Sequence, residues 1–269
     1  MRSEISMTLE SYYKKFNEDH RLKARHGQVE FFVTMHYIKK FLSQISECDR
    51  RDASEIKILD VGAATGAYSV PLCREGFDVT AVELTKTNFD ILRAKHENIK
   101  CWNADARDLH FLPDETFDLA LLLGPLYHLR TQEEKLCALS QARRVIKIGG
   151  VIFAGYVMNE YAVLTYCFGK NKIKENFLRG EIDEDFKTVC GDGDLYSYSR
   201  REEIDFLAKE ARLERVAIFS PDGPADYMRR ELNSFDEETF ELFKKYALCV
   251  SSRPDLLGAG SHLVDVLKK

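Results

Sequence analysis

Short apolar runs alternate with longer amphipathic stretches between about residue 55 and residue 156. Apolar runs of this length, separated by helix-length segments, are typical of buried parallel strands joined by crossover helices. We therefore expect an α/β fold with helices on both faces of a mostly parallel sheet. The pattern predicts strands at 57–61, 78–83, 99–103, 117–123 and 151–156, and helices at 68–75, 87–96 and 131–148.

The two ends of the chain follow other patterns. Five apolar side chains from Phe31 to Ile45 recur at spacings of 4, 3, 4 and 3, which places them on one stripe of a helix. Such a stripe has to pack against an apolar surface, so we expect residues 1–50 to form a helical cover. Later in the chain, residues 157–194 have the pattern of a helical insertion, and two further strands are predicted at 213–219 and 262–267.

Local signals predict where several helices begin and end. The segments Thr131–Glu134, Ser199–Glu202 and Ser234–Glu237 each have the spacing of a capping box, in which a hydroxyl and a glutamate bond each other's free amides. Each is therefore expected to begin a helix. Gly149 and Gly150 are expected to end the helix that begins at Thr131, because glycine adopts the left-handed turn that closes a helix.

Composition excludes several classes of protein. With 269 residues, 45% hydrophobic and 31% charged, the chain has the composition of a folded protein, and we expect a single domain over residues 1–269. No apolar run approaches the roughly 20 residues of a membrane-spanning helix. The first residues also lack the apolar stretch of a secretory signal, so the expected location is cytoplasmic, without a membrane partner.

Charge and cysteine content narrow the choice further. The net charge of −5 gives no long-range attraction for a phosphate backbone, so nucleic acid is not expected as a partner. The seven cysteines are odd in number and include no C-x-x-C pair, which indicates neither a disulfide framework nor a zinc site. No metal is therefore expected, and nothing in the sequence indicates an oligomeric state.

A glycine-rich turn follows the first predicted strand. It begins at Asp60 and contains Gly62, Ala63 and Gly66. The glycines leave the backbone open to a ligand, and the helix that follows presents free amides. The turn lies at the carboxyl end of its strand, where open α/β sheets bind ligands.

Two carboxylates end the next two strands. Glu83 follows the second strand, 21 residues after Gly62, where a carboxylate accepts hydrogen bonds from both hydroxyls of a ribose. Asp105 follows the third strand, where a carboxylate accepts a hydrogen bond from an adenine amino group. The three strand ends together predict a slot for an adenosine-containing ligand.

These motifs, in this order, resemble those of the class I methyltransferases that use S-adenosylmethionine. Residues 60–66 match the family's D-x-G-x-x-x-G motif, Glu83 its ribose-binding acid, and Asp105 with Ala106 its adenine-binding pair. The resemblance covers roughly residues 55–156. It implies a doubly wound, seven-stranded, mostly parallel sheet of order 3-2-1-4-5-7-6, with the seventh strand antiparallel.

The resemblance also implies the roles of particular residues. The loop from Gly124 to His128 resembles the one that flanks the sulfonium in small-molecule members, so Tyr127 and His128 are the candidate catalytic residues. In the N-terminal cover, Tyr12 and Tyr13 are candidates to close over the cofactor, and Arg25 to bind its carboxylate. The remaining cofactor contacts implied are Asp60, Gly62, Ala63, Gly66, Glu83, Leu84, Asp105, Ala106 and Leu123.

The implied reaction is transfer of a methyl group from S-adenosylmethionine, by in-line displacement, to a small-molecule acceptor. S-adenosylhomocysteine would be the product. The cofactor carries its own leaving group, so the protein mainly aligns and desolvates, and a general base is needed only if the acceptor loses a proton. Insertions at 157–194 and 221–261 are expected to shape the acceptor pocket.

Other classes of protein share parts of this pattern. A nicotinamide-dependent oxidoreductase would have the fold and the ribose acid, but its G-x-G-x-x-G fingerprint is absent because residue 64 is Ala64. A base-flipping nucleic-acid methyltransferase would favour Asn or Asp before two prolines and an aromatic, whereas residues 124–127 are Gly-Pro-Leu-Tyr. The G-x-S-x-G motif of many hydrolases is also absent. A non-catalytic protein that binds S-adenosylmethionine remains an alternative.

Overall fold

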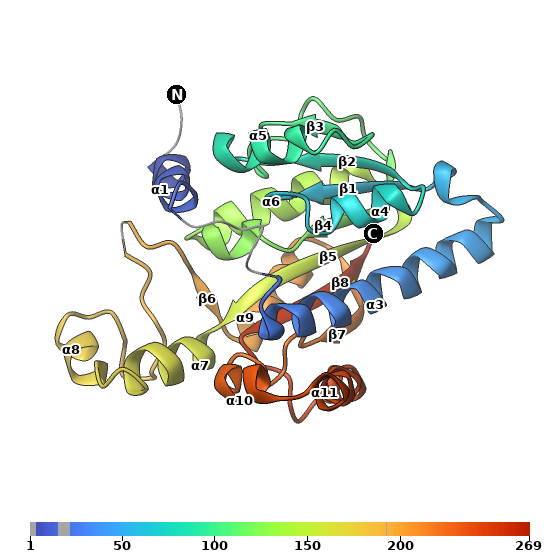
Figure 1. Ribbon diagram of the computed structural model, residues 1–269. Helices are drawn as coiled ribbons and strands as arrows, with labels where there is room; N and C mark the ends of the chain where they lie inside the picture. The colour runs from blue at the N-terminus through green and yellow to red at the C-terminus, as the bar shows by residue number, and fades with distance from the viewer. Residues whose placement is uncertain (1–3, 16–21, 192) are drawn as a thin grey trace.

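The computed structural model describes residues 4–15, 22–191 and 193–269, which form one twisted sheet with helices on both faces (Figure 1). The sheet order is β3-β2-β1-β4-β5-β8-β7, and β6 pairs with the end of β5. β8 runs antiparallel to β5 and β7. The strands are β1 (Lys57–Val61), β2 (Asp78–Val82), β3 (Lys100–Trp102), β4 (Phe117–Leu122), β5 (Ile146–Met158), β6 (Tyr198–Ser199), β7 (Glu214–Phe219) and β8 (His262–Lys268).

The predicted fold class and strand order are confirmed. β7 and β8 are the sixth and seventh strands of the prediction, and the two-residue β6 was not predicted. The helices are α1 (Glu4–Tyr13), α3 (Arg25–Asp49), α4 (Ser69–Arg74), α5 (Lys86–Ala94), α6 (Gln132–Val145), α7 (Asn159–Ala162), α8 (Ile173–Leu178), α9 (Arg201–Glu210), α10 (Arg229–Ser234) and α11 (Glu237–Val250). The other helical segments are the 3-10 turns η1 (Ala53–Glu55) and η2 (Pro125–His128) and the π-helical segment η3 (Val163–Phe168).

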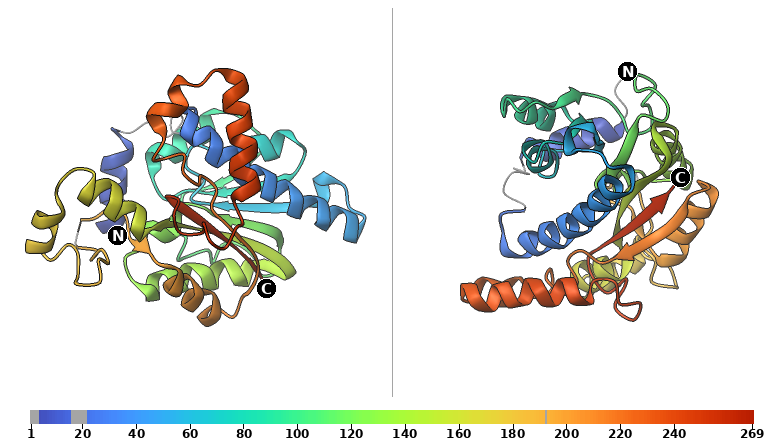
Figure 2. Two further views of the ribbon diagram at one scale, coloured as in Figure 1. Left: turned by 90° about the horizontal axis from the view of Figure 1, so that it is seen from below. Right: turned by 90° about the vertical axis from the view of Figure 1, so that its right-hand side faces the viewer.

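The helices form a layer on each face of the sheet (Figure 2). α6 and α9 pack on one face, and α3, α10 and α11 pack on the other. The predicted helical cover is confirmed for α1 and α3, while residues 1–3 and 16–21 of it lie outside the described residues. On α3 the predicted stripe faces the sheet, with Ile38 and Leu42 fully buried.

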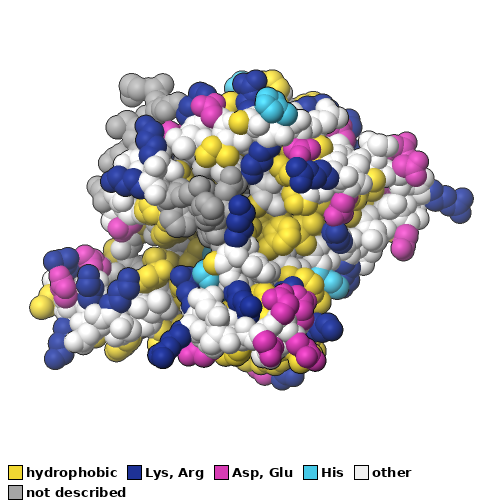
Figure 3. Space-filling model, in the orientation of Figure 1, with side chains coloured by type: hydrophobic (Ala, Val, Ile, Leu, Met, Phe, Trp, Pro, Cys, Tyr) yellow, Lys and Arg dark blue, Asp and Glu magenta, His cyan; other side chains and the backbone are white. Residues whose placement is uncertain are grey.

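The surface carries both signs of charge. On the face shown in Figure 3, Lys and Arg side chains are interspersed with Asp and Glu side chains. No helix among the described residues combines the length and the apolar character needed to span a bilayer.

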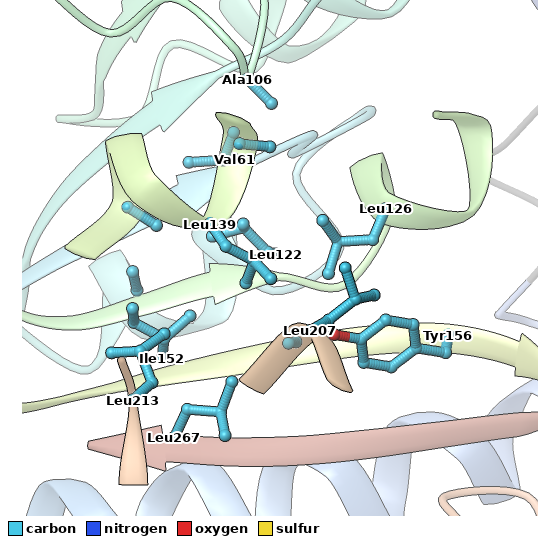
Figure 4. Close-up of a cluster of buried hydrophobic side chains, with 14 of the residues drawn as sticks. Val61, Ala106, Leu122, Leu126, Leu139, Ile152, Tyr156, Leu207, Leu213 and Leu267 are labelled. Carbon is cyan, nitrogen blue, oxygen red and sulfur yellow. The ribbon is translucent and has the colours of Figure 1, made fainter. Parts of the chain in front are cut away.

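The core follows from the two-residue period of the central strands. Along β4, Leu119 and Leu121 face the layer of α3, while Ala120 and Leu122 face the layer of α6 and α9. Figure 4 shows the second layer, where Leu122 of β4 lies with Leu139 of α6 and Leu207 of α9. Because helices bury both faces of the sheet, a ligand can reach the central strands only at their ends.

The predicted end of the helix from Thr131 is wrong. The Thr131 capping box is confirmed, since its hydroxyl accepts a hydrogen bond from the Glu134 amide at 3.2 Å. The helix nevertheless stops at Val145, and Ile146 already pairs with Phe117 in the sheet. The left-handed conformation of Gly149, at φ +83°, therefore belongs to an irregularity within β5 and does not close a helix.

The other two predicted capping boxes are also wrong. Ser199 lies in β6, and α9 begins two residues later without a side-chain cap. The cap of α11 is Asp236, whose carboxylate accepts a hydrogen bond from the Thr239 amide at 2.8 Å. The hydroxyl of Ser234 instead donates to a main-chain carbonyl of α10. A capping motif acts only where the tertiary fold begins a helix.

Candidate active site

A pocket lies at the carboxyl ends of the central strands, where the sheet order reverses between β1 and β4. Its empty volume is about 940 Å³, part of which is open to solvent. The structure brings most of the predicted site residues together here. Those that line the pocket are Asp60, Gly62, Ala63, Glu83, Leu84, Asp105, Ala106, Leu123, Tyr127 and His128.

The glycine turn forms one wall of the pocket. Gly62 adopts φ +75°, and a Cβ at this position would lie 2.7 Å from Cδ of Pro125 in the loop after β4. The amides of Gly62 and Ala63 donate to the carbonyl of Val82 at 2.8 and 3.1 Å. The turn is thus held between the end of β2 and the loop after β4, and only glycine fits there.

Asp60 is a buried acid at the base of this wall. Its carboxylate is 3% exposed and accepts a hydrogen bond from the hydroxyl of Ser69, at the start of α4. Burial raises the pKa of Asp60 to about 6, and the nearby carboxylate of Glu83 acts in the same direction. Asp60 therefore links β1 to α4 behind the turn.

Glu83 lines the pocket and also bonds to the chain around it. One carboxylate oxygen accepts from the amide of Ala64 at 2.9 Å. The other accepts from the amide and the hydroxyl of Thr85, at 2.8 and 2.7 Å. Glu83 consequently ties the glycine turn after β1 to the start of α5.

Asp105 is oriented by an arginine that the sequence analysis missed. The guanidinium of Arg107 donates to both oxygens of Asp105, at 3.1 and 2.7 Å, and also forms an ion pair with Glu134 of α6. The hydrogen bond to Asp105 is the main reason that the pKa of Arg107 is raised. Arg107 itself lines the pocket.

His128 presents a defined ring nitrogen to the pocket. Its Nδ1 lies 2.7 Å from the carbonyl of Leu195, and because a carbonyl only accepts, Nδ1 carries the proton. The opposite nitrogen, Nε2, accepts from the hydroxyl of Tyr13 at a long 3.5 Å. Burial lowers the pKa of His128 to about 4, so the ring is neutral at pH 7 with its lone pair on Nε2.

Two predicted cofactor contacts lie outside this pocket. Arg25 donates to the carbonyls of Leu232 and Phe235, at 3.0 and 2.8 Å, and its guanidinium lies over the ring of Phe240. Arg25 thus ties α3 to α10 and α11, and the structure does not support it as a ligand for the cofactor carboxylate. Gly66 does not line the pocket. A Cβ at this position would lie 2.5 Å from the Leu92 side chain, so glycine is needed there for packing against α5.

Several lining residues carried no motif in the sequence. Leu9 comes from α1 and Leu22 from the segment before α3, whereas Asn88 comes from the first turn of α5. Tyr13 of α1, which was predicted as a candidate to close over the cofactor, also lines the pocket. The aromatic pair at residues 12–13 was the one signal that pointed to α1. Asn88 and Arg107 reach the pocket through the short connections after β2 and β3, and no local spacing marks them.

Comparison with known proteins agrees with the fold. Residues 58–150 match a family model described as a methyltransferase domain. A solved S-adenosylmethionine-dependent methyltransferase from Methanosarcina mazei has the same fold, with a TM-score of 0.54 and 14% identity over 82% of this chain and 96% of that one. The chain therefore has the fold of these methyltransferases, and its residues 58–150 are similar to a methyltransferase domain.

Curated relatives resemble parts of the chain. A demethylmenaquinone methyltransferase of Tropheryma whipplei is 35% identical over 97 residues, which are 35% of this chain and 38% of that protein. A tRNA N(3)-cytidine methyltransferase of Mus musculus is 24% identical over 174 residues, 61% of each protein. The chain thus spans less than two thirds of the length of these relatives.

Proposed function

We propose that this chain is a methyltransferase that transfers a methyl group from S-adenosylmethionine to a small-molecule acceptor and releases S-adenosylhomocysteine. One observation carries the proposal: the ends of β1, β2 and β3 bring the glycine turn, Glu83 and Asp105 to the same pocket. A Rossmann-like pocket with this set of groups suits an adenosine bearing a charged amino-acid tail. The methyltransferase domain in residues 58–150 supports the same cofactor.

The lining residues fit this cofactor by their chemistry. Glu83 offers a carboxylate for the ribose hydroxyls, and Leu84 with Ala106 offers apolar surface for a purine ring. The glycine turn lines the pocket at Gly62 and Ala63, where the methionine part would lie. Bound S-adenosylmethionine would supply a methyl group on a sulfonium, so the chain has to align the acceptor and exclude water.

His128 is our candidate base for an acceptor that must lose a proton. It lines the pocket, its Nε2 lone pair is directed at the Tyr13 hydroxyl, and the bond from Nδ1 to Leu195 holds the tautomer. Tyr127, whose ring centroid lies 4.7 Å from that of His128, forms the adjoining wall.

The acceptor side is proposed to extend toward the two insertions. His262, at the start of β8, has its ring 6.2 Å from that of Tyr127, which links the wall of the pocket to the region of residues 221–261. Residue Leu195, just beyond the 157–194 insertion, bonds to His128. These contacts support the assignment of acceptor recognition to both segments.

A small molecule is favoured over a nucleic acid as acceptor. The chain has a net charge of −5, and the face in Figure 3 mixes both signs of charge. The Tropheryma relative is named for a small-molecule acceptor, while the mouse relative is named for a tRNA. A tRNA is therefore included among the acceptors to be tested. We also propose a cytoplasmic location.

Binding and turnover test the proposal separately. Thermal-shift titration should show stabilisation by S-adenosylhomocysteine and none by NAD, and the reverse result would assign a nicotinamide enzyme instead. Transfer of labelled methyl from S-adenosylmethionine should then be measured with phenols, hydroquinones, small amines and tRNA. Saturable binding without transfer to any of them would favour a non-catalytic binding protein.

A further inference from the structure

A carboxylate of the N-terminal helix bonds to the cofactor half of the sheet. Glu10 of α1 accepts hydrogen bonds from the main-chain amides of Lys86 and Thr87, at 2.7 and 3.3 Å, and from the hydroxyl of Thr87 at 2.5 Å. These amides are the first two of α5. Figure 1 shows α1 beside the start of α5, at the edge of the sheet that holds the pocket.

Glu10 occupies a position that favours a negative charge. The first amides of a helix have no partner within the helix, and their aligned dipoles make this end positive. Thr85 precedes α5 but forms no side-chain cap, so Glu10 supplies the cap from another helix. Burial opposes ionisation, yet the bonds from Thr87 and Lys86 leave the pKa of Glu10 below its ordinary value.

The neighbours of Glu10 on α1 form part of the pocket. Leu9 is 5% exposed and lines the pocket beside the turn that Glu10 caps. Tyr13, one helical turn further on, also lines the pocket and donates to Nε2 of His128. The carboxylate of Glu10 thus bonds to α5 from the same helix that brings Leu9 and Tyr13 to the pocket.

We propose that Glu10 is a positioning residue: by capping α5 it holds α1 over the cofactor pocket, slows cofactor release and sets Tyr13 against His128. The statement about the cofactor rests on the proposed function, whereas the attachment of α1 to α5 does not. Neither Leu9 nor Tyr13 can keep its place if α1 separates from α5.

The first experiment measures the attachment without any ligand. Amide hydrogen exchange over residues 4–13 should be faster in Glu10→Ala and in Thr87→Val than in the natural protein, by about fivefold to tenfold, as expected when a helix cap is removed. Because both variants break the same contact, the double variant should exchange no faster than the quicker single one. Glu214→Gln, which changes an exposed carboxylate on β7, is the matched control and should leave this exchange unchanged.

The second experiment measures release of S-adenosylhomocysteine. Trp102 is the one tryptophan of the chain and ends β3 next to the Asp105 loop, so its fluorescence can report occupancy in stopped flow. Glu10→Ala should release the ligand about tenfold faster, with Glu10→Gln between it and the natural protein because an amide oxygen accepts but carries no charge. Unfolding by urea, measured in parallel, identifies any variant whose faster release reflects global destabilisation.

The outcomes separate the two proposals. If Glu10→Ala and Thr87→Val leave exchange over residues 4–13 and ligand release unchanged, or if their effects simply add, Glu10 does not position α1 through α5. If the natural protein binds no S-adenosylhomocysteine, the proposed function fails, and the exchange data alone still decide the attachment.

Discussion

Replacing Glu83 by glutamine tests whether one carboxylate both builds the pocket and binds the cofactor. In the structure one oxygen of Glu83 accepts from the amide of Ala64, and the other accepts from the amide and hydroxyl of Thr85. A glutamine of the same shape can satisfy only one of these sides with its oxygen. If the glutamine oxygen accepts from Thr85, the glutamine NH2 group faces the Ala64 amide. Two hydrogen-bond donors then oppose each other.

The expected cost follows from those bonds. A hydrogen bond to a charged group contributes about 1.5–3 kcal/mol, and leaving a buried donor unpaired costs about 1–3 kcal/mol. Glu83 is 5% exposed, so water cannot replace the lost partner. We expect Glu83→Gln to lower the free energy of unfolding of the ligand-free protein by about 2–3 kcal/mol. Affinity for S-adenosylhomocysteine should fall at least about tenfold, which is about 1.4 kcal/mol.

Urea unfolding and titration calorimetry measure the two effects separately. Thr85→Val is the matched control, because it removes the hydroxyl donor but keeps the carboxylate and both amides. It should cost about 1 kcal/mol of stability and leave the affinity nearly unchanged. An unfolding free energy of Glu83→Gln within about 0.5 kcal/mol of the natural protein would show that the carboxylate does not hold the turn. Unchanged affinity would remove Glu83 from the ribose site.

Three further predictions concern the same pocket. Gly62→Ala should reduce S-adenosylhomocysteine affinity and cost more than about 1 kcal/mol of stability, because the new Cβ would meet Pro125 at 2.7 Å and the φ of +75° disfavours alanine; normal calorimetry and unfolding would contradict this. Since the pKa of Asp60 is raised to about 6, its contribution to stability is full below about pH 4 and is lost as the pH rises through 6. Between pH 4 and pH 7 the free energy of unfolding of Asp60→Asn, relative to that of the natural protein, should therefore rise by up to about 3 kcal/mol. A difference in urea unfolding that does not change with pH would refute this. The pKa of His128 is lowered to about 4, so its contribution is full above pH 6.5 and is lost as the pH falls through 4; His128→Gln should flatten the stability curve in that window, and an equal slope in both proteins would show that the ring titrates normally.

The cofactor half of the site could be predicted because its residues follow strand ends. Asp60 lies near the end of β1, Glu83 directly follows β2 and Asp105 lies just beyond β3, and parallel strands place their carboxyl ends on the same side of the sheet. Their positions at the ends of neighbouring strands therefore indicated that the three acids meet in one pocket. The same regularity made the order of the sheet predictable.

The capping boxes predicted at Ser199 and Ser234 failed, and Arg25 lies outside the pocket, for a common reason. Their local pattern is compatible with several partners, and contacts far along the chain decide among them. Arg25 is bound by the carbonyl of Leu232, 207 residues away, and Ser199 is taken into a strand beside β5. No local spacing carries that information, because long-range packing determines which helix end meets which loop.

The cofactor side and the proposed acceptor side of the pocket are held together by different kinds of contact. On the cofactor side, recognition and folding use the same atoms: the carboxylate of Glu83 that would meet a ribose also holds the turn that would meet the methionine part. On the acceptor side, Tyr13, His128 and Leu195 come from segments more than 60 residues apart, joined by single hydrogen bonds. Substitutions there can change the acceptor without disturbing the core, whereas substitutions at Glu83 cannot. On the function proposed above, the acceptor is therefore best sought by experiments directed at His128 and α1.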